Sequence, residues 1–337
     1  MTYIMKRIVL FGATGAVGTY TAIELKKRGY NIIAVGRRSS DNGFFAEYGI
    51  EYYSVDITCP DDFRKLPLDD IYCVIHFAGI LPAAMKGYYP HKYIDTVLGG
   101  TLNVLNYCLT TKAEKIIFSQ SRADSNYLMD QGPIPSDIVK KFPLTGDHSV
   151  YSICKNAAVD LIEHYYYQYG LKRFILRFPT IYAYHPNPYF YVNGIRKWKA
   201  YRYLIEQAIK GETIEIWGDP MRAKEIVYVK DAIQIVEKCL ESDLDGGMYN
   251  VGRGIPVTLK EQILGIVEIF SSEEHPSAVV YRPDKPNARD YVNDISKTCR
   301  ELGYKPEYDY KTLLIDYKKE MLTESFKKLW GSPADYE

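Results

Sequence analysis

The sequence lacks an excess of charge of either sign, and it lacks long apolar runs. Lys and Arg together number 42, as do Asp and Glu, so the formal net charge is zero. General binders of nucleic acids or anionic membranes carry a basic excess. No apolar run reaches the roughly 18 to 20 residues that cross a bilayer, and the opening MTYIMKRIVLFGATG has no apolar core or cleavage site of a signal peptide. We therefore expect a cytoplasmic protein that binds neither nucleic acid nor membrane.

Closely spaced cysteines are also missing. The six cysteines are scattered and show no CxxC spacing. Several of them stand in apolar stretches, where a reduced cysteine behaves as a small hydrophobic residue. We expect free thiols and no metal site.

What the sequence does contain is an alternation of short apolar segments and amphipathic segments. The apolar segments predict strands at 7–11, 31–35, 51–55, 72–77, 115–119 and 173–178, and helices are expected at about 16–29, 60–65, 91–111 and 149–169. This alternation predicts an α/β fold with an open, doubly wound parallel sheet of the Rossmann type. The pattern becomes irregular after about residue 180. We expect a dinucleotide-binding domain at 1–180 and, at 181–337, mainly a smaller α/β substrate-binding lobe with segments that cross back.

A glycine-rich turn follows the first predicted strand and opens the first predicted helix. Gly12, Gly15 and Gly18 are spaced three apart in FGATGAVG. Glycines at this spacing permit a tight turn, let a diphosphate approach the backbone, and let helix and strand pack closely. The free N–H groups near Ala16 and Val17 would face the phosphates. The turn therefore predicts a dinucleotide site.

The second predicted strand ends without the carboxylate that such sites commonly use. An Asp or Glu about 20 residues after the turn binds the ribose 2′-hydroxyl of NAD, but no acidic residue occurs between Leu25 and Ser40. Arg37 and Arg38 stand there instead. Because a guanidinium forms charge-assisted bonds to a phosphate, we expect these two arginines to bind the 2′-phosphate of NADP, with NAD as the alternative cofactor.

Tyr151 and Lys155 are four residues apart in a segment of helical periodicity, so they share one helix face. A nearby ammonium and a cationic nicotinamide would lower the pKa of the tyrosine, which could then exchange a proton with a sugar or alcohol oxygen. Ser119 and Ser121 lie where the strand before this helix ends. Ligands bind at such strand ends in open α/β sheets, and a hydroxyl there can bond the reacting oxygen.

The glycine turn, the serine strand end and the Tyr-x-x-x-Lys helix together resemble the extended short-chain dehydrogenase/reductases. Over nearly the whole chain the sequence is similar to their NAD-dependent epimerase/dehydratase family, which modifies nucleotide sugars. The segments WGDPMRAKEIVYVKDAI, YNVGRG and YRPDKPNARDYVNDISK carry the resemblance in the second half.

The resemblance implies roles for individual residues. It implies Ser121, Tyr151 and Lys155 as catalytic residues and Ser121, Thr180, Lys224 and Arg282 as substrate-binding residues. For the cofactor it implies Gly12, Thr14, Gly15, Ala16, Val17, Gly18, Arg37, Arg38, Asp56, Ile57, Phe77, Ala78, Gly79, Ser119, Tyr151, Lys155, Phe178, Pro179 and Thr180.

The chain departs from the family at two points that bear on the reaction. Lys224 and Glu225 stand where the family often has Arg-Asp, so the diphosphate contact is weaker there or moves to Arg222. The dehydratase branch has an Asp-Glu pair after the catalytic Ser/Thr, but Arg122 and an alanine follow Ser121. This argues against dehydration.

Three functions stay open, and the favoured one is an NADPH-dependent reductase of 4-keto nucleotide sugars. The alternatives are a nucleotide-sugar 4-epimerase with tightly bound NAD(P) and a non-catalytic NADPH-binding regulator. In the family, helices equivalent to 91–111 and 149–169 pair across a homodimer. Because the run from Tyr165 to Tyr167 extends beyond one core-facing stripe, we expect a homodimer here as well.

Overall fold

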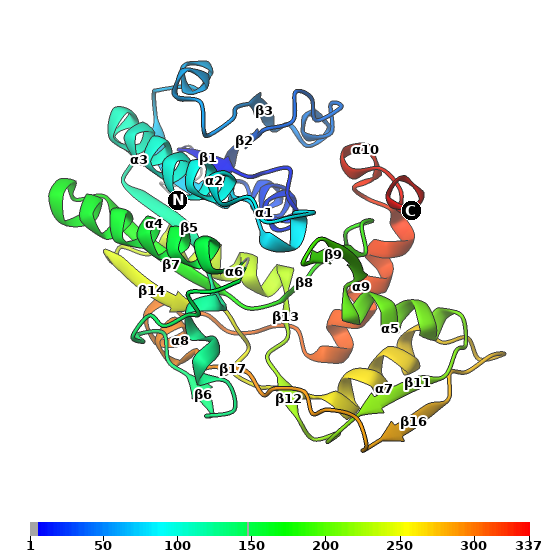
Figure 1. Ribbon diagram of the computed structural model, residues 1–337. Helices are drawn as coiled ribbons and strands as arrows, with labels where there is room; N and C mark the ends of the chain where they lie inside the picture. Colours follow the sequence, from blue (N-terminus) through cyan, green and yellow to red (C-terminus); the bar gives the residue numbers. More distant parts are fainter. Residues whose placement is uncertain (1–5, 147) are drawn as a thin grey trace.

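The computed structural model describes residues 6–146 and 148–337, and its centre is a parallel sheet of seven strands (Figure 1). The strand order is β14-β7-β5-β4-β1-β2-β3. The strands are β1 (Arg7–Phe11), β2 (Asn31–Gly36), β3 (Glu51–Ser54), β4 (Ile71–His76), β5 (Lys115–Ser121), β7 (Lys172–Phe178) and β14 (Gly246–Asn250). The chain runs outward from β1 to β3 and then returns to the other side of β1. This reversal between β1 and β4 is the point where doubly wound sheets bind ligands, and it confirms the predicted Rossmann-type fold.

The near-continuous apolar character of the strands reflects burial on both faces of the sheet. Successive side chains point to opposite faces, so in β1 Ile8 and Leu10 enter one core while Val9 and Phe11 enter the other. Helices α1 (Ala16–Lys27) and α6 (Val229–Glu241) cover the first face; α3 (Gly100–Thr111) and α4 (His148–Tyr169) cover the second. Each fully buried aliphatic side chain stabilises the fold by about 1.5–3 kcal/mol.

The elements after β7 build a second group that lies beyond one end of the sheet (Figure 1). Its helices are α5 (Ala200–Ile209), α7 (Leu259–Phe270), α8 (Ser296–Leu302), α9 (Tyr310–Thr323) and α10 (Lys327–Trp330). Its short strands are β8 (Ile181–Tyr182), β9 (Tyr189–Val192), β10 (Ile195–Trp198), β11 (Ile214–Trp217), β12 (Ala223–Lys224), β13 (Val227–Tyr228), β15 (Val257–Thr258), β16 (Val279–Arg282) and β17 (Val292–Asn293), which pairs with β6 (Pro133–Ile134). Because α6 and β14 return to the central sheet, the two halves of the sequence interleave.

Two predicted helices differ in kind from the expectation. Residues 60–65 form a 3₁₀ helix, and the predicted helix 91–111 is divided into α2 (Pro90–Tyr93), a π-helical turn (Ile94–Gly99) and α3. The π turn ends next to Gly100, the first residue of α3, where the helix packs closely against the loop after β3. A Cβ on Gly100 would stand 2.6 Å from Cδ1 of Ile57 in that loop. Single π turns are frequent at functional sites.

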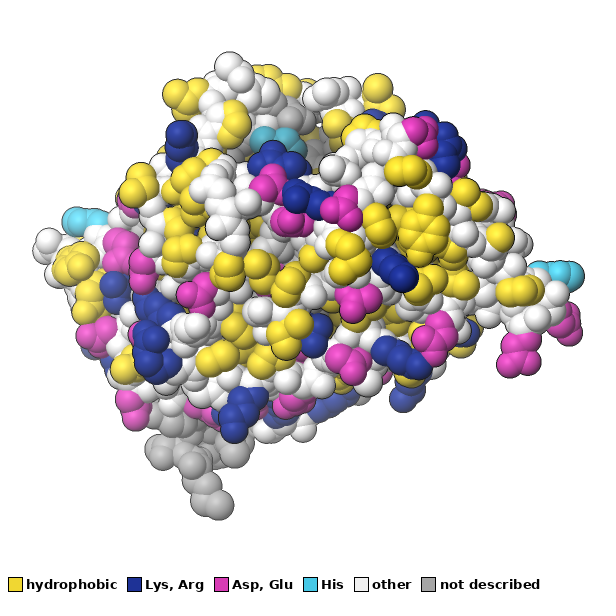
Figure 2. All heavy atoms as spheres, turned by 90° about the horizontal axis from the view of Figure 1, so that it is seen from below, with side chains coloured by type: hydrophobic (Ala, Val, Ile, Leu, Met, Phe, Trp, Pro, Cys, Tyr) yellow, Lys and Arg dark blue, Asp and Glu magenta, His cyan; other side chains and the backbone are white. Residues whose placement is uncertain are grey.

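Charged side chains of both signs are interspersed on the molecular face seen in Figure 2, where no basic patch stands out. The cysteines are free, and four of them are buried: Cys73, Cys108, Cys154 and Cys239. Within the part of the chain that the structure describes, no helix is long and apolar enough to cross a membrane.

Candidate active site

The glycine turn shows a separate steric reason for each glycine. Gly12 has a φ of +89°, and a Cβ there would stand 2.6 Å from the backbone nitrogen of Ala78. A Cβ on Gly18 would stand 2.1 Å from the carbonyl oxygen of Gly12, so close packing of the helix against the turn excludes any side chain. Gly15 is different, because its Cβ would meet only the Gly12 oxygen, at 3.4 Å. The backbone at Gly15 is therefore open to a ligand.

The helix that starts after this turn has an uncapped N-terminus. Helix α1 begins at Ala16, its N-cap Gly15 supplies no side-chain hydrogen bond, and its first turn holds no acidic residue. The first N–H groups of a helix have no partner within the helix, and they favour an anion. An uncapped helix N-terminus behind an open glycine backbone fits the diphosphate of a dinucleotide.

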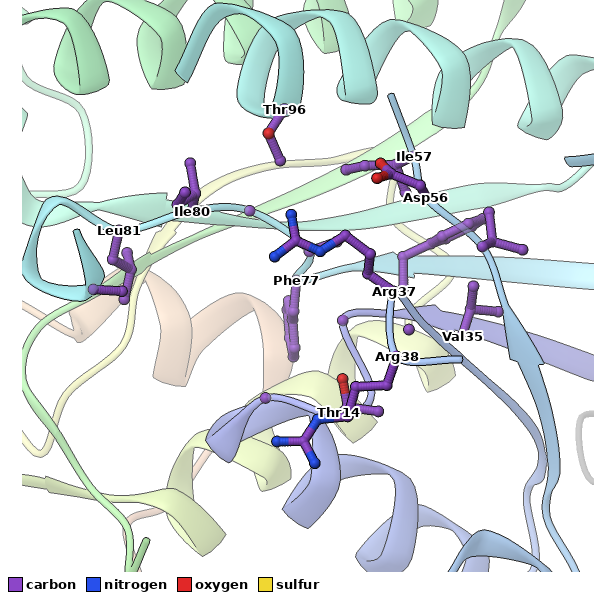
Figure 3. A pocket seen from close by; sticks show the side chains of 18 residues that line it. Thr14, Val35, Arg37, Arg38, Asp56, Ile57, Phe77, Ile80, Leu81 and Thr96 are labelled. Carbon is purple, nitrogen blue, oxygen red and sulfur yellow. The ribbon is translucent and has the colours of Figure 1, made fainter. Parts of the chain in front are cut away.

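A pocket of about 510 Å³ extends from the glycine turn along the ends of β1, β2 and β4 (Figure 3). Ten of the predicted cofactor residues line it: Gly12, Thr14, Gly15, Arg37, Arg38, Asp56, Ile57, Phe77, Ala78 and Gly79. Thr96, from the π turn, lines it as well. The open glycine backbone, the uncapped helix N-terminus and Arg37 give this pocket groups that bind phosphate, so the described residues fit a dinucleotide.

The two arginines at the end of β2 point in different directions. Figure 3 shows the Arg37 guanidinium on the side of Thr96 and Asp56, whereas that of Arg38 lies beside Thr14. Arg37 is exposed and makes no ion pair or side-chain hydrogen bond with residues 6–146 or 148–337. Position 36 has no room for a carboxylate, because a Cβ on Gly36 would stand 2.8 Å from the Thr14 side chain. Arg37 is therefore the guanidinium available to a ligand.

Arg38 is bound by the C-terminal segment, by which we mean residues 326–337. Arg38 donates to the carbonyl oxygen of Leu329, and Nε1 of Trp330 donates to the carbonyl oxygen of Thr14 at 3.0 Å. The Trp330 ring also lies 4.5 Å from that of His185, centroid to centroid. The segment thus packs against Arg38 and Thr14, two residues that line the dinucleotide pocket. The sequence offered no signal for this contact.

The predicted catalytic residues come together at the end of β5. Nζ of Lys155 donates to the carbonyl oxygen of Ser119 at 2.6 Å and lies 4.3 Å from the centre of the Phe118 ring. Ser121 lies near the hydroxyl of Tyr151, which is 4% exposed, and lowers its pKa. One turn of α4 separates Tyr151 from Lys155, and this spacing puts both on the face of α4 that meets β5. The shared helix face of Tyr151 and Lys155 is thus packed beside the serines.

The surrounding protein groups shift the pKa values of Tyr151 and Lys155. For Tyr151 the shift is opposite in direction to the expected one. Burial raises the pKa of Tyr151 to about 12, and the neighbouring Ser121 offsets only part of this rise. Burial lowers the pKa of Lys155 to about 7. The protein groups alone therefore do not produce the expected fall in the pKa of Tyr151, because desolvation outweighs the effect of Ser121.

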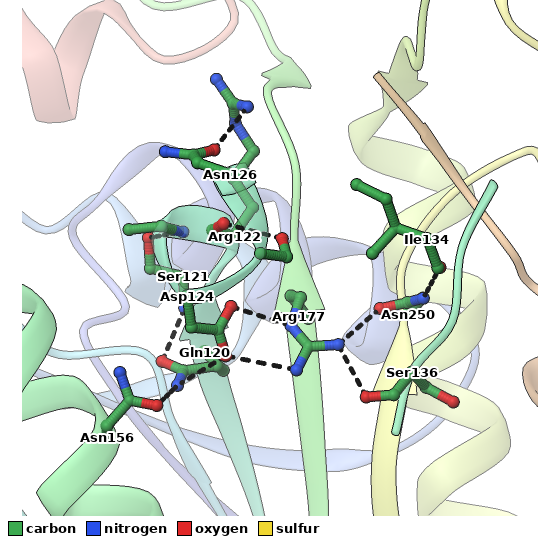
Figure 4. A network of polar contacts seen from close by, with 12 residues as sticks. Gln120, Ser121, Arg122, Asp124, Asn126, Ile134, Ser136, Asn156, Arg177 and Asn250 are labelled. Carbon is green, nitrogen blue, oxygen red and sulfur yellow. Dashed lines mark hydrogen bonds and ion pairs between the residues drawn. The ribbon is translucent and has the colours of Figure 1, made fainter. Parts of the chain in front are cut away.

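A buried polar network, which the sequence did not reveal, supports the strand end behind Ser121 (Figure 4). Asp124 and Arg177 are 1% and 2% exposed, and both oxygens of Asp124 accept from the guanidinium at 3.1 and 3.2 Å. Arg177 also donates to Asn250 at 3.0 Å, and Gln120 contacts Asp124 at 3.5 Å. Burial raises the pKa of Asp124 while Arg177 opposes the rise. This carboxylate is enclosed by its partners, so it is not free to act as an acid or base.

A second cavity, of about 280 Å³, opens beside this centre. Its lining residues are Arg122, Met129, Thr180, Lys224, Glu225, Arg289 and Tyr291. Two predicted substrate residues, Thr180 and Lys224, thus line one cavity. Arg282 does not line it, and its guanidinium is bound to Glu215 at 2.7 Å and Asp284 at 3.0 Å.

The fold is of the Rossmann type, with a pocket that fits a dinucleotide and a cluster of Ser121, Tyr151 and Lys155. The model of the NAD dependent epimerase/dehydratase family matches residues 8–252, well over half of the chain. The chain belongs to this family.

Individual relatives are distant but cover nearly the full length. The chain is 26% identical over 347 residues to the UDP-glucose 4-epimerase of Dictyostelium discoideum, covering 94% of this chain and 96% of the relative. Two solved structures share the fold. One is the UDP-glucose 4-epimerase of Thermotoga maritima with UDP-glucose, with a TM-score of 0.73 and 22% identity, covering 94% of this chain and 99% of the other. The second is the UDP-glucuronic acid 4-epimerase of Bacillus cereus with UDP-glucuronic acid and NAD, with a TM-score of 0.70 and 20% identity, and the same coverage.

Proposed function

We propose that the protein is a 4-epimerase of UDP-sugars that uses a nicotinamide dinucleotide. The observation that carries this proposal is the pairing of Ser121 with Tyr151 beside Lys155, next to a pocket that fits a dinucleotide. The names of the relatives support epimerisation over the 4-keto-sugar reduction that the arginine turn favours. Dehydration is disfavoured, because the one carboxylate soon after Ser121, that of Asp124, is enclosed by Arg177.

In this reaction Tyr151 takes the proton of the C4 hydroxyl and later returns it, while Ser121 bonds the same oxygen. The bound dinucleotide supplies the acceptor and donor of the C4 hydride. Lys155 holds the ribose and, in its charged form, stabilises the phenolate of Tyr151. Burial raises the pKa of Tyr151 and so disfavours its phenolate. Tyr151 therefore acts as a base when positive charge near its hydroxyl lowers that pKa.

We further propose NADP as the preferred dinucleotide. Arg37 lacks a protein partner among the described residues, and no carboxylate stands at the end of β2 to bind the 2′-hydroxyl of NAD. NAD is the alternative, because the epimerase from Bacillus cereus is described with NAD.

The reaction is tested with a panel of UDP-sugars and their 4-keto forms. Epimerase activity gives the C4 epimer with no net change in NADPH absorbance. A reductase consumes NADPH in proportion to a 4-keto substrate, and this result would replace the epimerase by the second candidate. Binding of NADPH without turnover of any nucleotide sugar would leave a non-catalytic regulator.

A further inference from the structure

The cavity beside Ser121 carries more positive charge than its surroundings neutralise. Arg122, Lys224 and Arg289 line it, and Glu225 is the only acidic residue among the lining residues. Arg289 is bound to Asp130, so its charge is compensated. Arg122 and Lys224 are the other two cations of this cavity.

Glu225 forms no ion pair with Arg122 or Lys224, because backbone groups already bind its carboxylate. It is 3% exposed, and its two carboxylate oxygens accept from the backbone nitrogens of Arg253 at 2.7 Å and Asn293 at 3.0 Å. Over residues 6–146 and 148–337, no carboxylate forms an ion pair with Arg122 or Lys224. Two cations therefore line one small cavity, and neither is paired with a carboxylate of the described chain.

The Arg122 guanidinium is held in place by uncharged groups. Nη1 donates to Oδ1 of Asn126 at 3.1 Å, and the guanidinium lies 4.7 Å from the centre of the Tyr291 ring (Figure 4 shows the contact with Asn126). Neither contact removes the positive charge. A planar guanidinium fixed in this way is ready to bind a carboxylate through two parallel hydrogen bonds.

We propose that Arg122 binds a carboxylate carried by the sugar ring of the substrate, so that the preferred substrates are nucleotide-linked uronic acids. This inference rests on the proposed function, which puts the C4 oxygen of the sugar at Ser121. Arg122 is the next residue, and C5, whose substituent becomes the carboxylate of a uronic acid, is bonded directly to C4. The diphosphate is attached at C1, across the ring from C4, so it lies farther from Arg122.

Lys224 has a complementary place in this arrangement. It lies on the short strand β12 and lines the same cavity as Arg122. Its ammonium is a compact charge without the paired geometry of a guanidinium. It suits a second contact to the anionic substrate, on either the carboxylate or the nearest phosphate.

The test compares the binding of UDP, UDP-glucose and UDP-glucuronic acid to the dinucleotide-loaded enzyme by titration calorimetry. UDP-glucuronic acid should bind at least about tenfold more tightly than UDP-glucose, as expected for a charge-assisted pair. Arg122→Gln should abolish this difference and leave the affinity for UDP unchanged. Arg289→Gln is the matched control, since it removes a cation that already has a partner, and it should preserve most of the difference.

The outcomes separate this inference from the proposed function. Equal affinities of the wild-type enzyme for the two sugars, or an equal loss for UDP and both sugars in Arg122→Gln, would overturn the carboxylate site alone. Failure of all three compounds to bind would overturn the UDP-sugar function together with it. Circular dichroism and dinucleotide affinity verify that Arg122→Gln is folded.

Discussion

The opposite directions of Arg37 and Arg38 lead to a prediction that separates two neighbouring residues of the same type. Arg37 is exposed and free of protein partners within the described chain, whereas Arg38 binds the carbonyl oxygen of Leu329. Removing Arg37 should therefore remove one charge-assisted contact to the 2′-phosphate. Such a contact contributes about 1.5–3 kcal/mol, which corresponds to a loss of about 10- to 150-fold in the affinity for NADPH. NADH has no 2′-phosphate, so its affinity should hardly change.

Arg38→Ala should behave differently, because Arg38 anchors the C-terminal segment to the wall of the pocket. We expect it to weaken NADPH and NADH by similar factors. Titration of each variant with both dinucleotides, followed by the fluorescence of the reduced nicotinamide, gives the four dissociation constants. A wild-type preference for NADH, or an equal effect of Arg37→Ala on both dinucleotides, would refute the assignment of Arg37 to the phosphate.

The remaining predictions concern catalysis, stability and assembly. Tyr151→Phe should slow epimerisation by roughly 10²- to 10⁴-fold with dinucleotide affinity preserved, and near wild-type turnover of the folded variant would remove Tyr151 from the mechanism. Because burial lowers the pKa of Lys155 to about 7, its protonation opposes folding at low pH. The free energy of unfolding of the dinucleotide-free protein should therefore rise between about pH 7 and 10 relative to that of Lys155→Met, in urea titrations. A difference that stays constant with pH would contradict this. Arg177→Met leaves Asp124 buried without its partner and should cost about 3–5 kcal/mol of stability, again in urea; a loss below about 1 kcal/mol would show that the network is not structural. Light scattering at micromolar concentration should give a homodimer through α3 and α4, since Tyr167 is 80% exposed, and a monomer would refute it.

The sheet could be predicted because its signals are local. Apolar segments buried on both faces predicted six of the seven strands, and the glycine spacing located the turn that lines the dinucleotide pocket. The seventh strand, β14, was not predicted, because the alternation of apolar and amphipathic segments becomes irregular after residue 180. In the run from Tyr165 to Tyr167, Tyr165 is buried and its hydroxyl donates to Asn106 at 2.8 Å, whereas Tyr167 is exposed. Helix periodicity alone did not separate the buried ring from its exposed neighbour.

The site was predictable only as far as neighbouring residues determine it. The Tyr151–Lys155 spacing is local, so their shared face could be read from the sequence. The rise in the pKa of Tyr151 could not, because it depends on how completely the fold removes water from the hydroxyl. The sequence shows that Arg122 replaces an acidic residue of the dehydratase branch, but it does not show that Arg122 lacks an ion pair. That depends on the backbone groups of Arg253 and Asn293, which bind the nearby carboxylate of Glu225.

The hydrogen bond from Trp330 to Thr14 joins residues 316 positions apart. Contacts of such separation form late in folding, because closing the intervening loop costs entropy first. A terminal segment can also open locally with less free energy than the whole domain needs to unfold. A dinucleotide that binds only the docked arrangement shifts that local equilibrium by mass action. Cofactor supply would then regulate how long the enzyme survives proteases, since the end of the chain is exposed to cleavage most often when the dinucleotide is scarce.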